Sequence, residues 1–473
     1  MNNLIKTFSL IIALTLSCYF VNAQTNLKVT LSGVPESKLQ IYSIAEGNNN
    51  LIKEFPSVRN GEQKNIEIPE KYLPGEFILF FEYAGKQGSG RPQQAERMII
   101  INKQNVVFFA NPNFINNPDS SYFNESDIEN KVLSEFANQT MQNLEMLDVI
   151  QTFLLKYDNQ DSDFYKSGIK EFQDRRKEHN DWIDNQLKEH KNLFCSNMFY
   201  FYYVPDVNWE GNIMERQQSL IDNYFTGMDF TNKNILRTSY LKSWMDNYVN
   251  KYIELATSQE MLTELFLEAG EKAIEESKKG DPYFYGWMVD YFFNGYEMMN
   301  IQEGITMLEK YTKDPNCMTY KRKEIDKRVT GIQNLTDGAI SPDFTFKDES
   351  GKDISFHNYK TKAPYKLVLF WSADCKHCHA LITELFAWHK NNKSKLEVFA
   401  LSLDESDTEI PKWEKRIPEL PGWIHILTQG GINSKEAESY YILSTPTMFL
   451  VDAKTNKIVA SPMSFEELMK IIN

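Results

Sequence analysis

The stretch 366–385 of the chain reads KLVLFWSADCKHCHALITEL. Its apolar run at 367–371 predicts a buried strand, and the residues from 376 onward are compatible with a helix. Between the two, Cys375 and Cys378 stand three residues apart. Cysteines at this spacing on the first turn of a helix lie on the same side, close enough for a disulfide. The pattern therefore predicts a strand that leads into a helix through a pair of thiols.

The position of the pair predicts different roles for its two sulfurs. Cys375 stands where the first turn of the helix leaves backbone N–H groups without a partner. These N–H groups and the helix dipole favour a thiolate, so we expect a lowered pKa for Cys375 and assign it as the attacking sulfur. Cys378, one turn inside the helix, would then resolve the mixed disulfide.

The elements around this pair alternate, which predicts an α/β domain over 337–473. A central sheet covered on both faces would account for the order of the elements. A short hairpin is expected around 349–352. The predicted strands are 366–372, 396–403, 423–427, 447–452 and 457–461, and the predicted helices are 376–391, 408–416, 433–441 and 464–472.

The region 24–112 alternates with period two and is predicted to be a β-sandwich-like domain, a small antiparallel sandwich or barrel. Turn residues separate its strands, among them 48–50, which are three asparagines, and Asn60-Gly61. It holds no cysteine and no cluster of histidine or acidic residues with metal-ligand spacing, so we favour a binding or docking module, for which the sequence names no ligand. The predicted strands are 27–33, 38–44, 77–85, 98–102 and 105–111.

The region 120–330 has 3.6-residue periodicity and is predicted to be a helical domain. Two parts, 194–203 and 283–296, are rich in aromatic residues. Core filling between packed helices is the interpretation that we favour for them, with a peptide-binding groove as the alternative. The predicted helices are 127–157, 163–192, 214–223, 239–256, 259–279 and 282–299.

The beginning of the chain has the pattern of a secretory leader. Lys6 precedes a short apolar region at 8–21, and Val21-Asn22-Ala23 has the small residues that signal peptidase recognises. We expect a signal peptide at 1–23 and a mature chain in the periplasm or elsewhere outside the cytoplasm. A lipoprotein anchor at Cys18 is the alternative, and it is the one route to membrane association that we expect.

Net charge and cysteine content argue against two classes of protein. The formal net charge of −14 argues against general nucleic-acid binding. Removal of the leader would leave four cysteines, too few for a disulfide scaffold in a chain of this length. Cys195 and Cys317 could form a second pair, but buried unreactive thiols are the interpretation that we favour.

Three segments together resemble the thioredoxin superfamily, in particular the extracytoplasmic TlpA/ResA-like thiol-disulfide oxidoreductases. They are DGAISPDFTFKDESGKDISF at 337–356, LFWSADCKHC at 369–378 and STPTMFLVD at 444–452. The resemblance implies that Cys375 is the nucleophile and that Cys378 resolves. It also implies a cis-proline at Pro446, after Thr445, that presents backbone to substrate beside the disulfide, and a Trp371 that packs near the disulfide.

Two departures from that family concern the proton of Cys378. Relatives carry an acid in the preceding strand or three residues after the second cysteine, where this chain has Leu369 and Leu381. Glu384 could substitute, although a surface carboxylate is the interpretation that we favour for it, and water is a further acceptor.

Asp374, which precedes Cys375, and His377, which lies between the two cysteines, have opposite effects on the thiolate. His377 favours the thiolate of Cys375, whereas the carboxylate of Asp374 opposes it.

Two cofactor sites compete with the thiol-exchange interpretation. C-x-x-C-H, completed by His379, is also the attachment motif of c-type haem, and one C-x-x-C beside a histidine could contribute to a zinc site. The order of strand, motif, helix and Thr445-Pro446 favours thiol exchange, so we expect no cofactor and no metal. The expected partners are protein thiols and disulfides and a redox partner that recharges the site. The alternative function is an envelope binding or assembly protein that uses a thioredoxin scaffold with little turnover.

Overall fold

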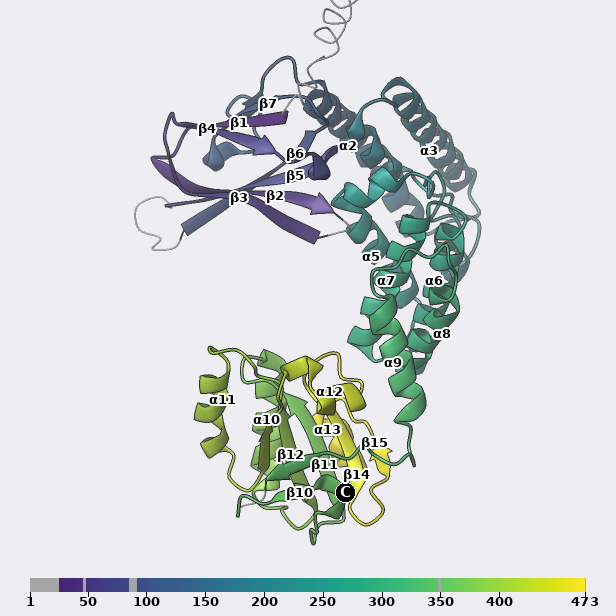
Figure 1. Cartoon of the computed structure of the whole chain (residues 1–473). Coiled ribbons are helices and arrows are strands. Elements are labelled where there is room, and N and C mark those ends of the chain that lie inside the picture. Colours follow the sequence, from purple (N-terminus) through teal and green to yellow (C-terminus); the bar gives the residue numbers. More distant parts are fainter. Residues whose placement is uncertain (1–24, 46–47, 85–91, 348–349, 473) are drawn as a thin grey trace, which may run out of the picture. The chain divides into compact units, whose positions relative to one another are not determined.

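The computed structural model describes residues 25–45, 48–84, 92–347 and 350–472 (Figure 1). The predicted leader and Cys18 lie outside this part of the chain. The chain divides into two compact units, one made of Met1–Ala269 with Lys279–Phe284 and the other of Gly270–Lys278 with Tyr285–Asn473. A β-rich region, a helical region and an α/β region follow one another along the chain, which confirms the predicted fold class.

The N-terminal region consists of two four-stranded sheets. One sheet has the order β4 (Gln63–Ile68), β1 (Thr25–Leu31), β7 (Val106–Ala110) and β8 (Tyr122–Phe123), and the other has β3 (Asn48–Arg59), β2 (Glu36–Ala45), β5 (Gly75–Ala84) and β6 (Pro92–Ile101). Alternate residues of the strands, such as Leu27, Val29 and Leu31 of β1, enter one shared apolar core. The period-two pattern of the sequence therefore reports one buried face per strand.

Two expectations for this region were wrong. The asparagines at 48–50 were predicted to form a turn, but β3 begins at Asn48 and pairs antiparallel with β2, with Asn49 opposite Ile44. Ladder hydrogen bonds come from the backbone, so asparagines can occupy a strand when the neighbouring strand pairs with them. The sheets are also not wholly antiparallel, because β1 and β7 run parallel.

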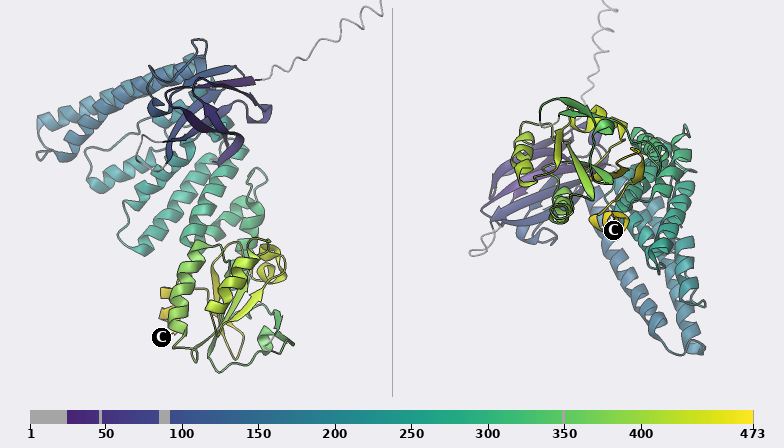
Figure 2. Two further views of the ribbon diagram at one scale, coloured as in Figure 1. Left: turned by 90° about the vertical axis from the view of Figure 1, so that its left-hand side faces the viewer. Right: turned by 90° about the horizontal axis from the view of Figure 1, so that it is seen from below.

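The helical region begins with two long helices, α2 (Ile128–Lys156) and α3 (Asp163–Glu189), which lie side by side in both views of Figure 2. The aromatic stretch after them is a 3-10 helix at Phe194–Tyr202 that buries Phe194 and Phe199. Helices α4 (Ile213–Asp222) and α5 (Tyr240–Ile253) follow, and α6 (Gln259–Ser277) and α7 (Pro282–Met299) run through both units. Phe284 and Phe292 of α7 are buried as well, so the structure confirms core filling for both aromatic stretches.

The second unit continues with α8 (Gln302–Thr312) and α9 (Arg322–Asn334) and then forms a five-stranded sheet. Its order is β13 (Ile424–Leu427), β12 (Leu396–Ser402), β11 (Tyr365–Trp371), β14 (Thr447–Asp452) and β15 (Ile458–Ala460). Strands β11, β12 and β13 are parallel, and β14 and β15 are antiparallel to their neighbours. A small hairpin of β9 (Thr345–Lys347) and β10 (Asp353–Ser355) precedes the sheet.

The central strand β11 is apolar along most of its length because both faces of the sheet are covered. Leu369 and Trp371 point to one face and pack in a core with α10 (Lys376–His389) and α13 (Phe465–Ile472). Val368 and Phe370 point to the other face, where the core includes Ala437 of α12 (Lys435–Ser439). The helix α11 (Ile410–Arg416) follows β12. Within the described residues, no helix is long and apolar enough to span a membrane.

Candidate active site

The thiol pair lies where β11 passes into α10. Cys375 is the N-cap residue of α10, with an extended backbone, and the N–H of Cys378 donates to its Sγ at 3.1 Å. The two cysteines form a disulfide, with their Cα atoms 5.2 Å apart. The first sulfur therefore occupies the helix N-terminus, the position that stabilises negative charge.

The two sulfurs differ in exposure. Cys375 is partly exposed, whereas Cys378 is fully buried among apolar side chains of the core that β11 and α10 share. An incoming disulfide can therefore reach Cys375 and not Cys378. This asymmetry agrees with the roles assigned from the sequence, although the roles themselves remain predictions.

The loop before β14 brings a second element to the pair. The Thr445–Pro446 peptide bond is cis, and the carbonyl oxygen of Thr445 lies 3.4 Å from the Sγ of Cys375. The structure therefore places Cys375 beside Thr445, which lies 70 residues later in the chain and precedes Pro446. The substrate-positioning role of Thr445 and Pro446 remains a prediction.

Trp371 and the two leucines lie behind the disulfide. Trp371, Leu369 and Leu381 are buried in the same apolar cluster as Cys378. The indole N–H of Trp371 has no hydrogen-bond partner within the described part of the chain. Glu384 is exposed on α10, in agreement with the surface interpretation. The immediate surroundings of Cys378 are thus apolar at the two positions where relatives carry an acid.

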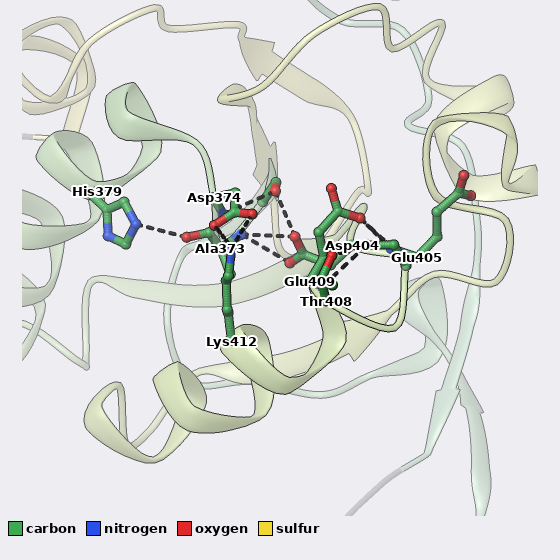
Figure 3. A network of polar contacts seen from close by, with 10 residues as sticks. Ala373, Asp374, His379, Asp404, Glu405, Thr408, Glu409 and Lys412 are labelled. Carbon is green, nitrogen blue, oxygen red and sulfur yellow. Dashed lines mark hydrogen bonds and ion pairs between the residues drawn. The ribbon is translucent and has the colours of Figure 1, made fainter. Parts of the chain in front are cut away.

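A buried carboxylate that the sequence did not reveal holds the loop between β11 and the disulfide (Figure 3). Asp404, 1% exposed at the end of β12, accepts a hydrogen bond from the hydroxyl of Ser372 at 2.6 Å. The backbone N–H of Ala373 donates to both of its oxygens at 3.0 Å, and the hydroxyl of Ser402 donates at 2.6 Å. Each donor satisfies part of the hydrogen-bonding capacity of a group that would be costly to bury alone.

The carbonyl group of Ala373 is bound by a side chain of α10. The Nε2 of His379 donates to the carbonyl oxygen of Ala373 at 2.8 Å, so Asp404 and His379 clamp one residue from two sides (Figure 3). His379 is also the histidine of the C-x-x-C-H pattern, and its side chain is engaged in this hydrogen bond to Ala373. The described residues contain no group of histidine, cysteine and acidic side chains arranged to hold a metal ion.

The charge of Asp374, which the sequence suggested would oppose a thiolate at Cys375, has a partner in the structure. Both carboxylate oxygens of Asp374 bind the ammonium group of Lys412 on α11, at 2.6 and 2.5 Å (Figure 3). The negative charge that opposes a thiolate at Cys375 is therefore accompanied by a positive one. His377 is exposed on the first turn of α10, and its effect on Cys375 remains a prediction. No sequence signal pointed to Lys412, which lies 38 residues from Asp374.

The remaining thiols are separate from this site. Cys195 and Cys317 are both free and buried. Burial raises the pKa of the Cys317 thiol to about 11 and raises that of Cys195 as well. The structure thus confirms the interpretation of these cysteines as buried thiols, and each stays protonated at neutral pH.

The site and fold define a class, and the comparisons with known proteins agree with it. Residues 338–460 match the model of the AhpC/TSA family. With a central parallel strand that leads into a helix capped by the thiol pair, the C-terminal region is a thioredoxin-superfamily domain, the fold of thiol-disulfide oxidoreductases. A comparison with curated proteins gave no match.

Several solved structures are similar to parts of the chain. The thioredoxin domain of a thiol-disulfide oxidoreductase from Bacteroides vulgatus is 28% identical, with a TM-score of 0.25, over 29% of this chain and 99% of that one. A thioredoxin-like protein from Bacteroides caccae is 17% identical, with a TM-score of 0.38, over 57% of this chain and 97% of that one. A domain of a possible thiol-disulfide isomerase from Cytophaga hutchinsonii is 24% identical, with a TM-score of 0.25, over 29% and 90%.

Proposed function

We propose that the chain is a TlpA/ResA-like thiol-disulfide oxidoreductase that exchanges disulfides with protein substrates outside the cytoplasm. The observation that carries the proposal is the asymmetry of the pair. Cys375 is partly exposed at a helix N-terminus beside the cis Thr445–Pro446 peptide, and Cys378 is sealed behind it. Such a pair can accept one external sulfur at a time and then eject it.

In the reducing direction, the thiolate of Cys375 attacks one sulfur of a substrate disulfide. The new S–S bond links Cys375 to the substrate, and the second substrate sulfur leaves as a thiolate. Cys378 loses its proton and attacks the Sγ of Cys375, which releases the first substrate sulfur and closes the Cys375–Cys378 disulfide. The substrate gains two electrons and the pair loses two; oxidation of a dithiol substrate is the same sequence reversed.

The neighbours of the pair support these steps. The N-terminus of α10 stabilises the Cys375 thiolate, and exposed His377 adds to this effect when it is protonated. The backbone around Thr445 and Pro446 positions the substrate beside Sγ. Trp371 packs in the core behind the pair. Water that enters when the disulfide opens accepts the proton of Cys378, since its described surroundings are apolar.

A location outside the cytoplasm is supported by the leader pattern at 1–23 and by the persistence of structural and catalytic disulfides in oxidising compartments. A lipid at Cys18 would tether the same domain to the envelope. Labelling of intact cells and of separated envelope fractions would distinguish a released protein from a tethered one.

Dithiothreitol-coupled reduction of insulin by the full chain tests the activity. We expect turnover that Cys375→Ser abolishes and that Cys378→Ser replaces with a trapped mixed disulfide. Cys317→Ala, a change to a buried thiol outside the site, is the matched control and should retain turnover. Rates equal to those of dithiothreitol alone would instead favour a scaffold with little turnover. Equilibration with glutathione then gives the reduction potential and hence the direction of exchange.

A further inference from the structure

A groove in the second compact unit adjoins the cis-proline loop. It encloses a cavity of about 430 Å³, lined by Pro446 and Thr447 on one side and by Arg328 and Ile332 of α9 on the other. Small-ligand pockets have volumes of about 300–1,000 Å³, so the groove can hold a short peptide segment. It begins one residue from Thr445, whose carbonyl oxygen is 3.4 Å from the Sγ of Cys375. The residue that contacts this sulfur is therefore a direct neighbour in the chain of Pro446, which lines the groove.

The wall formed by α9 is fastened to the loop that precedes the cis-proline. The ammonium group of Lys327 donates to the carbonyl oxygen of Ile442 at 2.9 Å, and the amide of Asn334 donates to the hydroxyl of Tyr441 at 2.8 Å. A Cβ on Gly331 would lie 2.8 Å from the Cβ of Tyr441, closer than side-chain atoms come. The absence of a side chain at Gly331 thus permits the contact that holds the wall against the loop.

The other wall offers an unpaired strand edge. Strand β15 pairs with β14 at Leu450 and Val451, and no ladder partner is described on that side for the earlier residues of β14. Thr447, Met448 and Phe449 belong to this earlier part and line the groove. Met448 and Phe449 are almost fully buried, so Thr447 is the residue of this edge that can offer main-chain hydrogen bonds to an extended peptide.

The helical wall also carries charge. The Nε of Arg328 lies 2.7 Å from a carboxylate oxygen of Glu297, and the two side chains are 24% and 23% exposed. Both line the groove, so the wall presents a fork of N–H donors beside an acceptor. Together with the apolar surface of Ile332, this is the chemistry of a site for peptide carbonyl and N–H groups and one apolar side chain.

We propose that this groove binds the polypeptide segment next to the substrate cysteine that joins Cys375, and that α9 selects among substrates. The inference rests on the proposed function, because the mixed disulfide delivers the segment. The occupant is an extended stretch of another protein, with an apolar side chain placed against Ile332. A free small disulfide lacks such a stretch and does not use the groove.

Photocrosslinking in the full-length Cys378→Ser variant tests the location. The probe is a synthetic peptide with one cysteine, activated as a thiopyridyl disulfide, and a benzophenone side chain two residues before or after it. The thiolate of Cys375 attacks the cysteine sulfur of the peptide and displaces pyridinethione, which can be counted. After irradiation and digestion, we expect crosslinks within 328–335 or at Met463, which also lines the groove.

The outcomes of this experiment separate two failures. Release of pyridinethione with crosslinks confined to other surfaces, or with none, would overturn the groove and leave the proposed function intact. No release of pyridinethione would overturn both, because Cys375 would not be a working nucleophile.

A matched pair of variants tests selection by α9. Ile332→Trp fills the groove, whereas Gln333→Trp places the same side chain on an exposed position of the same helix outside it. We expect the ratio of the rate with the peptide to the rate with a small aromatic disulfide to fall about tenfold for Ile332→Trp, as for loss of one apolar subsite, and to stay unchanged for Gln333→Trp. Equal ratios in the two variants would contradict the role of α9.

Discussion

Replacing Asp404 by alanine removes the acceptor that holds the loop before the disulfide. Three donors lose their partner: the hydroxyls of Ser372 and Ser402 and the N–H of Ala373. The hydroxyls can rotate toward other acceptors, but the buried N–H cannot. A hydrogen bond to a charged group contributes about 1.5–3 kcal/mol, and a buried donor left unpaired costs about 1–3 kcal/mol. We therefore expect a loss of about 3 kcal/mol in the free energy of local opening.

Amide hydrogen exchange measures this loss in the intact chain, region by region. A decrease of about 3 kcal/mol corresponds to exchange roughly a hundredfold faster, since each 1.4 kcal/mol is a factor of ten. The acceleration should be confined to the segment 371–379 and the end of β12. Asp404→Asn keeps one oxygen for the N–H of Ala373 and should show about half of the effect in kcal/mol.

Asp407→Ala is the control, because Asp407 is exposed on the same loop. If the amides of 371–379 exchanged at the same rate in the Asp404→Ala and Asp407→Ala variants, the carboxylate of Asp404 would not hold the loop. Acceleration spread over the whole domain would mean that Asp404 supports the fold in general and not this loop in particular.

Three further predictions concern titratable groups. Glu76 accepts a hydrogen bond from the backbone N–H of Ser239, and burial raises the pKa of its carboxyl group from 4.5 to about 7. The stability that this group contributes is therefore fully present below pH 4.5 and is lost as the pH rises through about 7. Glu76→Gln should flatten this dependence, worth about 3 kcal/mol, in denaturant unfolding from pH 4 to 8. In Cys378→Ser, thiolate absorbance should titrate with a pKa for Cys375 below the free-thiol value of about 8.5; a value at or above it would contradict the assignment. Burial raises the pKa of Cys317 to about 11, so this thiol should react with thiol reagents only after the protein unfolds. If Cys317 of the folded protein were labelled as fast as free cysteine, its burial would be contradicted.

Much of the C-terminal domain was predictable from the sequence because each of its signals is local. Three local signals predict the same structure, a strand that leads into a helix. They are the continuous apolar run of β11, the spacing of the two cysteines and the small or polar residues between the run and the first cysteine. Strand and helix ends in this domain agree with the prediction within a few residues. The cis bond before Pro446 followed from the order of motifs, which the resemblance supplied.

What the sequence did not reveal depends on neighbours that folding brings together. Asp404 and Lys412 are ordinary acidic and basic residues in a polar stretch, and their roles follow from contacts with the loop 32 and 38 residues earlier. The parallel pairing of β1 with β7 likewise joins segments far apart in the chain, and period-two alternation is the same for either strand direction.

The contact of Gly331 with Tyr441 bears on how this protein can be dissected. A fragment that begins at residue 337 keeps both cysteines and the cis-proline but omits α9, which ends at Asn334. Such a fragment keeps the residues that contact the sulfur of Cys375 but lacks the wall of the groove that α9 forms. If α9 selects among substrates as proposed, preferences measured on an excised domain will be broader than those of the protein from which it was cut.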